Sequence, residues 1–294
     1  MPEFISKLQH NTYEKGEFSD EKPRSLEDTL ALIKNFPWDT ERALTDIQLT
    51  GPSVTIRDEY VNYLKVGLFF NGKFCIYYMD NDNHLYEYHA PDIEDACRIV
   101  NDFFNSTLEL SRFDRHIFNI GNQPHFVTSY FEYHIKPWRV IKLTGMLLGY
   151  SFLALLADIE LPKQGIELPP MIFVGLISLL FYSLPIWIYH RAIATRNNYL
   201  QISKGNDAFS FGYTQLDIRT YNKKDIAEIV VYANRGSRNP ILIEVYDINF
   251  KNGDSIRFSN MLIPDTAFHT KFSDSMNNLI IPFTPGKKSI LKVL

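Results

Sequence analysis

A stretch of twelve residues, 78–89, gathers the side chains of this chain best suited to chemistry. Its three acids and two histidines, together with the first of its tyrosines, are Tyr78, Asp80, Asp82, His84, Glu87 and His89. Imidazole and carboxylate groups bind metals and transfer protons, so an enzyme would need Asp80, Asp82, Glu87 and His84 to converge on one pocket. The residues alternate along an expected hairpin and therefore partly point to opposite faces. We expect ordinary surface polarity here, with no catalytic residue and no metal ligand.

The remaining signals of catalysis are also missing from the sequence. The two cysteines, Cys75 and Cys97, lie far apart without metal-like spacing, which argues against a disulfide scaffold and fits a reducing compartment. A single pairing between them stays open. Neither a G-x-S-x-G nucleophile elbow nor a G-x-x-x-x-G-K-[ST] phosphate loop occurs. We therefore expect no enzymatic activity and no cofactor.

The elements that carry these residues belong to an expected acidic α+β domain, residues 23–136, which follows a flexible N-terminus, residues 1–22. Ser25 begins a helix with a capping-box-like signal, and Pro91-Asp92 opens a second one, 93–104. Asn71-Gly72 is a strong hairpin signal inside a meander of about four strands, which are expected at 53–57, 60–70, 73–79 and 84–89. Residues 108–134 either continue this sheet or run along a membrane surface.

Charge is distributed unevenly along the chain. Residues 1–136 carry 13 basic and 22 acidic side chains, whereas residues 137–294 carry 17 and 12. An acidic excess of this kind is usually a solvated surface, but it also steers a basic partner toward the domain.

Two apolar runs, 140–157 and 171–189, predict a transmembrane helical hairpin over residues 137–190. Aromatic and basic residues flank the runs: Trp138, Arg139, Lys142, Trp187, Arg191 and Arg196. Lys163 is the only basic residue of the loop that connects the two runs, so the positive-inside rule places both termini in the cytoplasm. We expect a multi-pass protein of the bacterial inner membrane; the alternative is a buried helical pair inside a soluble fold. Gly145 and Gly149 allow close packing within the hairpin or in a homo-oligomer.

The last expected domain, residues 191–294, alternates like a serial antiparallel β structure and ends in a helix that starts at Pro264 or Asp265. The run of YLQIS, FSFGY, LDIRTYNKKDIAEIVVY and ILIEVYDINFKNGDSIRFS after a membrane hairpin resembles bacterial pleckstrin-homology-like (PH-like) domains. The resemblance implies a half-open β barrel capped by a helix, with a role in binding or assembly. The expected fold class is thus a membrane protein with an N-terminal α+β domain, a two-helix transmembrane hairpin and a C-terminal PH-like β barrel.

The expected partners are inferred from the charge distribution and from the expected membrane anchor. Four basic residues are candidates for contact with lipid headgroups or a partner: Lys223, Lys224, Arg235 and Arg238. An equally open alternative is that these basic residues only help to orient the chain in the membrane. The leading hypothesis is a non-enzymatic membrane-anchored scaffold that contacts the lipid bilayer and recruits a cytoplasmic protein. The second is a membrane-anchored immunity protein whose acidic domain neutralises a toxin. Nucleic acid is not an expected partner, because the only basic region lies beside the expected membrane.

Overall fold

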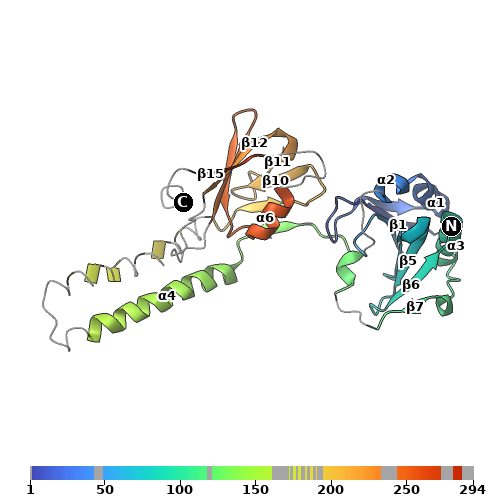
Figure 1. The fold of residues 1–294 in the computed structure, drawn as a ribbon, viewed down its shortest axis with the longest axis horizontal. Coiled ribbons are helices and arrows are strands. Elements are labelled where there is room, and N and C mark those ends of the chain that lie inside the picture. Colours follow the sequence, from blue (N-terminus) through green and yellow to red (C-terminus); the bar gives the residue numbers. More distant parts are fainter. Residues whose placement is uncertain are drawn as a thin grey trace. The chain divides into compact units, whose positions relative to one another are not determined.

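The computed structural model describes residues 2–42, 49–117, 121–160, 195–232, 244–272 and 281–286, with scattered positions between 172 and 190 (Figure 1). Contacts divide the chain into two compact units. Unit 1 comprises Met1–Tyr130 and Ser203–Asn206, and unit 2 comprises Phe131–Ile202 and Asp207–Leu294.

Unit 1 is built on one antiparallel seven-stranded sheet in the order β2-β1-β3-β4-β5-β6-β7. Its strands are β1 Phe4–Gln9, β2 Ser19–Arg24, β3 Ser53–Arg57, β4 Tyr63–Leu68, β5 Phe74–Met79, β6 Leu85–Ala90 and β7 Asp114–Arg115. The four central strands are those that the sequence predicts. Residues 1–22, expected as a flexible N-terminus, instead supply β1 and the start of β2.

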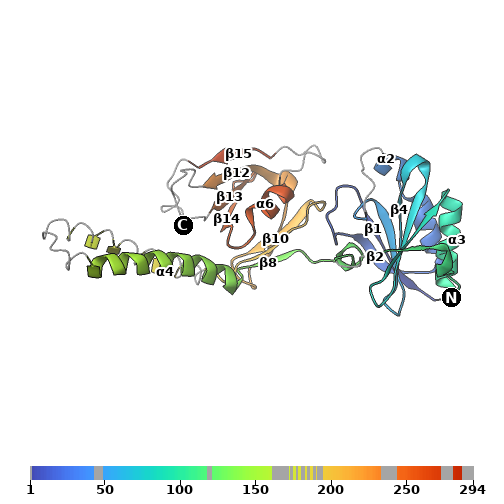
Figure 2. The same cartoon turned by 60° about the horizontal axis from the view of Figure 1, so that its bottom comes forward.

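Three helices belong to unit 1: α1 Leu26–Asn35, α2 Trp38–Arg42 and α3 Ile93–Phe104 (Figure 2). The carboxylate of Asp92 and the hydroxyl of Ser25 cap α3 and α1 by accepting backbone N–H bonds, as the sequence predicts. Apolar residues of α1 and α3, such as Ile33 and Val100, share one core with residues of the sheet. The short 3-10 helices of this unit are Phe70–Gly72, Leu110–Arg112 and Gln123–His125.

The turn between β4 and β5 confirms the predicted hairpin. Asn71 and Gly72 both have positive φ, 55° and 76°, a conformation that asparagine and glycine adopt at low cost. The backbone N–H of Lys73 donates to the carbonyl of Phe70, and Leu68 pairs with Phe74, so this short turn reverses the chain between β4 and β5.

Unit 2 contains two four-stranded sheets, ordered β11-β10-β9-β8 and β14-β13-β12-β15. The first is formed by β8 Glu132–His134, β9 Tyr199–Gln201, β10 Ala208–Gly212 and β11 Arg219–Asn222. The second is formed by β12 Ile226–Tyr232, β13 Val245–Phe250, β14 Ser255–Ser259 and β15 Phe283–Pro285, and a 3-10 turn at Lys223–Asp225 leads into β12. All pairings are antiparallel except that between β12 and β15.

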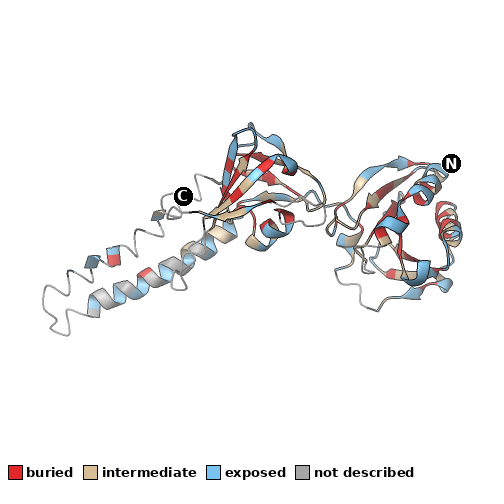
Figure 3. Ribbon diagram, turned by 45° about the horizontal axis from the view of Figure 1, so that its top comes forward, coloured by how far each residue is buried: buried red, intermediate tan, exposed pale blue. Residues whose placement is uncertain are grey.

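One aromatic-rich core joins both sheets of unit 2 to helix α6, Asp265–Phe272 (Figure 3). Phe268 is fully buried and stacks on Tyr246 with ring centroids 3.7 Å apart. The sequence predicts this helix to about residue 278, but residues 273–280 lie outside the described part of the chain. Helix α6 and the two sheets thus form a β structure with a packed helix, as the sequence predicts.

The prediction of a transmembrane hairpin is wrong, and with it the membrane part of the fold class and the inner-membrane localisation. Among the described residues, no helix is both long and apolar enough to cross a bilayer. Helix α4, Pro137–Glu160, contains the first predicted span, but Lys142 and Asp158 bound its uncharged part. Those 15 residues rise only ~22 Å, less than the ~30 Å of a hydrocarbon core. Most of the second predicted span, 171–189, lies outside the described residues.

Candidate functional site

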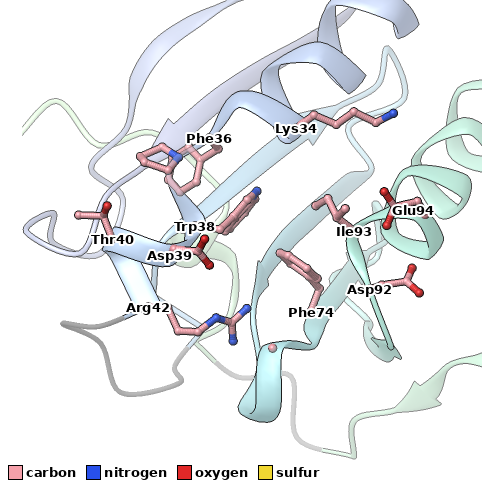
Figure 4. Close-up of a pocket in the computed structure, with 12 residues that line it drawn as sticks. Lys34, Phe36, Trp38, Asp39, Thr40, Arg42, Phe74, Asp92, Ile93 and Glu94 are labelled. Atoms are coloured by element: carbon pink, nitrogen blue, oxygen red, sulfur yellow. The ribbon is translucent and has the colours of Figure 1, made fainter.

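The candidate site is an open pocket in unit 1 with a volume of about 560 Å³. The end of α1 and the short α2 form one wall, the start of α3 forms the other, and Phe74 of β5 lies between them (Figure 4). Twelve residues line the pocket: Lys34, Phe36, Pro37, Trp38, Asp39, Thr40, Arg42, Gly72, Phe74, Asp92, Ile93 and Glu94. The fold therefore brings together three segments that are distant in sequence.

The floor of the pocket is aromatic and fixed in place. Trp38 is only 8% exposed, and its indole N–H donates to the carbonyl of Ile33 over 2.7 Å. Its ring meets Phe74 edge to face at 5.2 Å and Phe36 at 4.5 Å. Because these contacts hold the rings before any ligand arrives, little side-chain entropy would be lost on binding.

The rim of the pocket carries charges of both signs, but they differ in availability. The Arg42 guanidinium lies over the Phe74 ring and donates to the carbonyls of Phe69 and Lys73. Asp39 and Glu94 are exposed, and within the described residues neither carboxylate forms a hydrogen bond or ion pair. Lys34, also exposed on the lining, likewise forms no hydrogen bond or ion pair within the described residues, so the rim offers two free carboxylates and one free ammonium group to a ligand.

An aromatic floor below free carboxylates suits a side chain with an apolar stem and a cationic head. Lysine and arginine have this form, and the face of a tryptophan or phenylalanine ring attracts their charge. The lining contains no histidine and no cysteine, so it offers no nucleophile with an adjacent imidazole base.

Two of the four basic residues predicted to contact headgroups or a partner, Lys223 and Lys224, lie in the described part of the chain. Lys223 is only 4% exposed, and Lys224 forms an ion pair with Asp207. Arg235 and Arg238 lie outside the described residues. A second hollow of about 620 Å³ lies nearby in unit 2, and its lining includes Arg219 and Lys251 as well as Asp225 and Asp254. Its mixed charge gives no preference for phosphate.

The residues predicted to flank a membrane have different environments within unit 2. Trp138 is 70% exposed on α4, and Lys142 and Arg196 are exposed as well. The Arg139 guanidinium donates to the carbonyl of Met261 over 3.2 Å, and Trp187 packs against the core of the unit. Arg191 lies outside the described residues.

The acid and histidine residues at 78–89 separate into two groups. At the β5–β6 turn, Nδ1 of His84 lies 3.0 Å from Oδ2 of Asp80. Further along β6, Nε2 of His89 lies 2.7 Å from Oε1 of Glu87, and Nε2 of His116 lies 2.7 Å from Oε2 of the same carboxylate. Partial burial alone would raise the pKa of Glu87, but hydrogen bonds with both histidines outweigh burial and lower the pKa.

A model of the family described as PH domain matches residues 132–271, which run from β8 to the end of α6 and include α4. No curated protein and no solved structure matches the chain. The predicted resemblance to PH-like domains is therefore confirmed for residues 132–271, and the match does not include residues 1–131. Residues 132–271 form a PH-like domain.

Proposed function

We propose that this protein is a non-enzymatic binding protein. In this proposal, the pocket over Trp38 and Phe74 receives a lysine or arginine side chain from a protein partner. The observation that carries the proposal is the immobilised aromatic floor below two free carboxylates, Asp39 and Glu94. The PH-like domain supports a role in binding because domains of this kind serve mainly in recognition.

The expected free energy of binding comes mainly from one anchoring side chain. A cationic side chain over an aromatic face contributes about 0.5–2 kcal/mol, depending on how far it is desolvated. Burial of its methylene groups adds ~0.8 kcal/mol for each group. Basic residues of the partner would also meet the acidic surface of residues 1–136 during encounter, which raises the association rate at low salt.

The test is selection of a phage-displayed library of random linear peptides against the intact chain. We expect enriched peptides to share a lysine or arginine beside an apolar residue. Glu94→Lys replaces attraction by repulsion at the rim, so it should weaken the selected peptides by about 1–2 kcal/mol, or roughly five- to thirtyfold in Kd.

Glu109→Lys is the matched control, because Glu109 is exposed, undergoes the same charge change and does not line the pocket. It should leave the affinity within about twofold. Peptides that bind both variants equally, or a library that yields no enrichment, would refute the proposal.

The immunity-protein hypothesis stays a prediction. An acidic rim would fit a basic toxin surface as well as any other basic partner. The adjacent coding sequence tests the idea, since an immunity gene is expected beside the gene for its toxin.

A further inference from the structure

Four potential metal-binding side chains meet on the face of the unit 1 sheet that is opposite to α1 and α3. The strand register places Cys75 directly across from His89 and Tyr77 across from Glu87. His116 follows β7, and its backbone N–H donates to the carbonyl of Leu85. Alternate residues such as Phe74 and Ile76 enter the core below the helices, whereas these side chains project the other way.

The group is compact. One ligand atom from each of Cys75, Glu87 and His89 lies within 4.8 Å of the other two. Sγ of Cys75 is 3.3 Å from Oε1 of Glu87, and His116 contacts the other oxygen of that carboxylate at 2.7 Å. A single carboxylate thus connects a thiol and two imidazoles.

This combination of donors is specific in its chemistry. Thiolate, imidazole and carboxylate are the three ligand types of protein zinc sites. In a tetrahedral site with bonds of 2.0–2.3 Å, ligand atoms lie ~3.3–3.7 Å apart. The Glu87–His89 distance of 2.7 Å would have to lengthen by ~0.6 Å, and the Cys75–His89 distance, which is at most 4.8 Å, must reach the same range. Rotation about the side-chain bonds of Glu87 and His89 is the movement that would change these distances.

We propose that Cys75, Glu87 and His89 bind a transition-metal dication of the Zn²⁺ class. His116 holds the second carboxylate oxygen as a positioning residue, and a fourth coordination position is left for water. This site is separate from the pocket over Trp38, and the proposal does not depend on the proposed function.

The surroundings meet two further requirements of a metal site, an entry path and supported ligands. The side chains of His89 and His116 are 45% and 38% exposed, whereas Cys75 is buried at the base of the group. Phe69 stacks on the His89 ring with centroids 4.0 Å apart and restricts its rotation. An ion can therefore enter from solvent and meet ligands that are already oriented.

The test is titration of the intact, reduced and chelator-treated protein with Co²⁺. We expect one equivalent to bind and to produce the near-ultraviolet thiolate-to-cobalt charge-transfer band. Cys75→Ser should abolish the band, and His89→Asn should weaken Co²⁺ binding by more than about tenfold. His116→Gln should keep the band but reduce affinity between ~10- and 100-fold, as expected for a residue that orients a ligand.

Cys97→Ser and His84→Asn are the matched controls, since they remove the other cysteine and a nearby histidine. Both should bind Co²⁺ like the natural sequence. His89→Asn keeps the test valid if Cys75→Ser fails to fold, because His89 lies at the surface. Absence of the band, or a band that survives His89→Asn with unchanged affinity, would overturn the proposal.

Discussion

At the scale of single residues, the most unusual feature of unit 1 is a lysine in its interior. Lys65 is 1% exposed, and its ammonium donates to Oε1 of Gln9 over 2.7 Å and to the carbonyl of His125 over 3.1 Å. The rings of Phe18 and Phe126 lie 5.7 Å from its nitrogen. These neutral partners satisfy hydrogen bonds but do not balance a full charge.

The environment of Lys65 predicts that unit 1 becomes more stable as pH rises. Burial, and then the charge of Lys7, lower the pKa of Lys65 from 10.5 to about 7. Because the unfolded chain keeps the ordinary pKa, the cost of burying a charge is complete below pH 7 and disappears as pH approaches 10.5. The urea midpoint of unit 1, followed by Trp38 fluorescence in a Trp138→Phe, Trp187→Phe background, should therefore increase from pH 7 to pH 9.5.

Lys65→Met should make this increase smaller. Part of the pH dependence should remain, because the pKa of Lys7 is also lowered, to about 8, chiefly by burial. Lys73→Met, at an exposed lysine, should keep the full dependence. An identical pH dependence in Lys65→Met and the natural sequence would show that Lys65 stays protonated inside the fold.

Residue chemistry could be predicted only in part from the sequence. The hairpin that holds Cys75 and His89 follows from the predicted strands 73–79 and 84–89, but the pairing of these two residues depends on the observed register, in which Met79 faces Leu85. Alternation along the stretch 78–89 as a whole does not reveal that Glu87 and His89 project to the same face as Cys75. Alternation counted within each strand does. His116 directly follows β7, a strand of only two residues, Asp114–Arg115, which is too short to show a periodic pattern.

At the scale of elements, the N-terminus of α3 connects stability with the pocket. The Asp92 carboxylate accepts the backbone N–H of Asp95 over 2.8 Å, and the same residue lines the pocket. Asp92→Ala should lower the stability of unit 1 by about 1 kcal/mol, whereas Asp92→Ser should restore most of it because a hydroxyl also caps a helix. Urea unfolding followed by Trp38 fluorescence measures both, and equal destabilisation by the two substitutions would contradict the capping role.

The sequence predicts those elements that have strong local signals. The caps of α1 and α3 and the Asn71-Gly72 turn are local, and all three are found. Strand β2 is an edge strand of polar residues with Pro23 near its end, so it lacks the alternation of a half-buried strand. Strand β15 is three residues long and exists through its parallel pairing with β12, a contact that no local pattern encodes.

At the scale of the whole molecule, the two units have separate cores, and damage to one core should remain in that unit. Phe268 is fully buried, so Phe268→Ala should destabilise unit 2 by about 3–5 kcal/mol. Amide hydrogen exchange should then accelerate in β13 by roughly 100-fold or more while exchange in β4 stays the same. Thr266→Ala, on the exposed side of α6, is the control. Equal acceleration in β4 would mean that the chain unfolds as one cooperative body.

The whole-molecule prediction from sequence was half correct, and the failure has a physical cause. Apolar runs of 18 and 19 residues with basic and aromatic flanks resemble membrane spans, although Lys142 lies inside the first run. In α4, charges at Lys142 and Asp158 leave an uncharged segment too short for a bilayer. Strands β9, β10, β12, β13 and β14 lie within strands that the sequence predicts, and polar turns such as Asn252-Gly253 mark their ends, whereas β8 and β15 were not predicted.

The most direct test of the proposed binding pocket is the fluorescence of Trp38 during titration with a peptide selected from the library. In the Trp138→Phe, Trp187→Phe background the emission comes from Trp38 alone, since the chain has three tryptophans. The account predicts that the emission changes with the same Kd as binding measured by calorimetry, and that Glu94→Lys shifts both curves together. A peptide that binds by calorimetry without any change in Trp38 emission would contradict it.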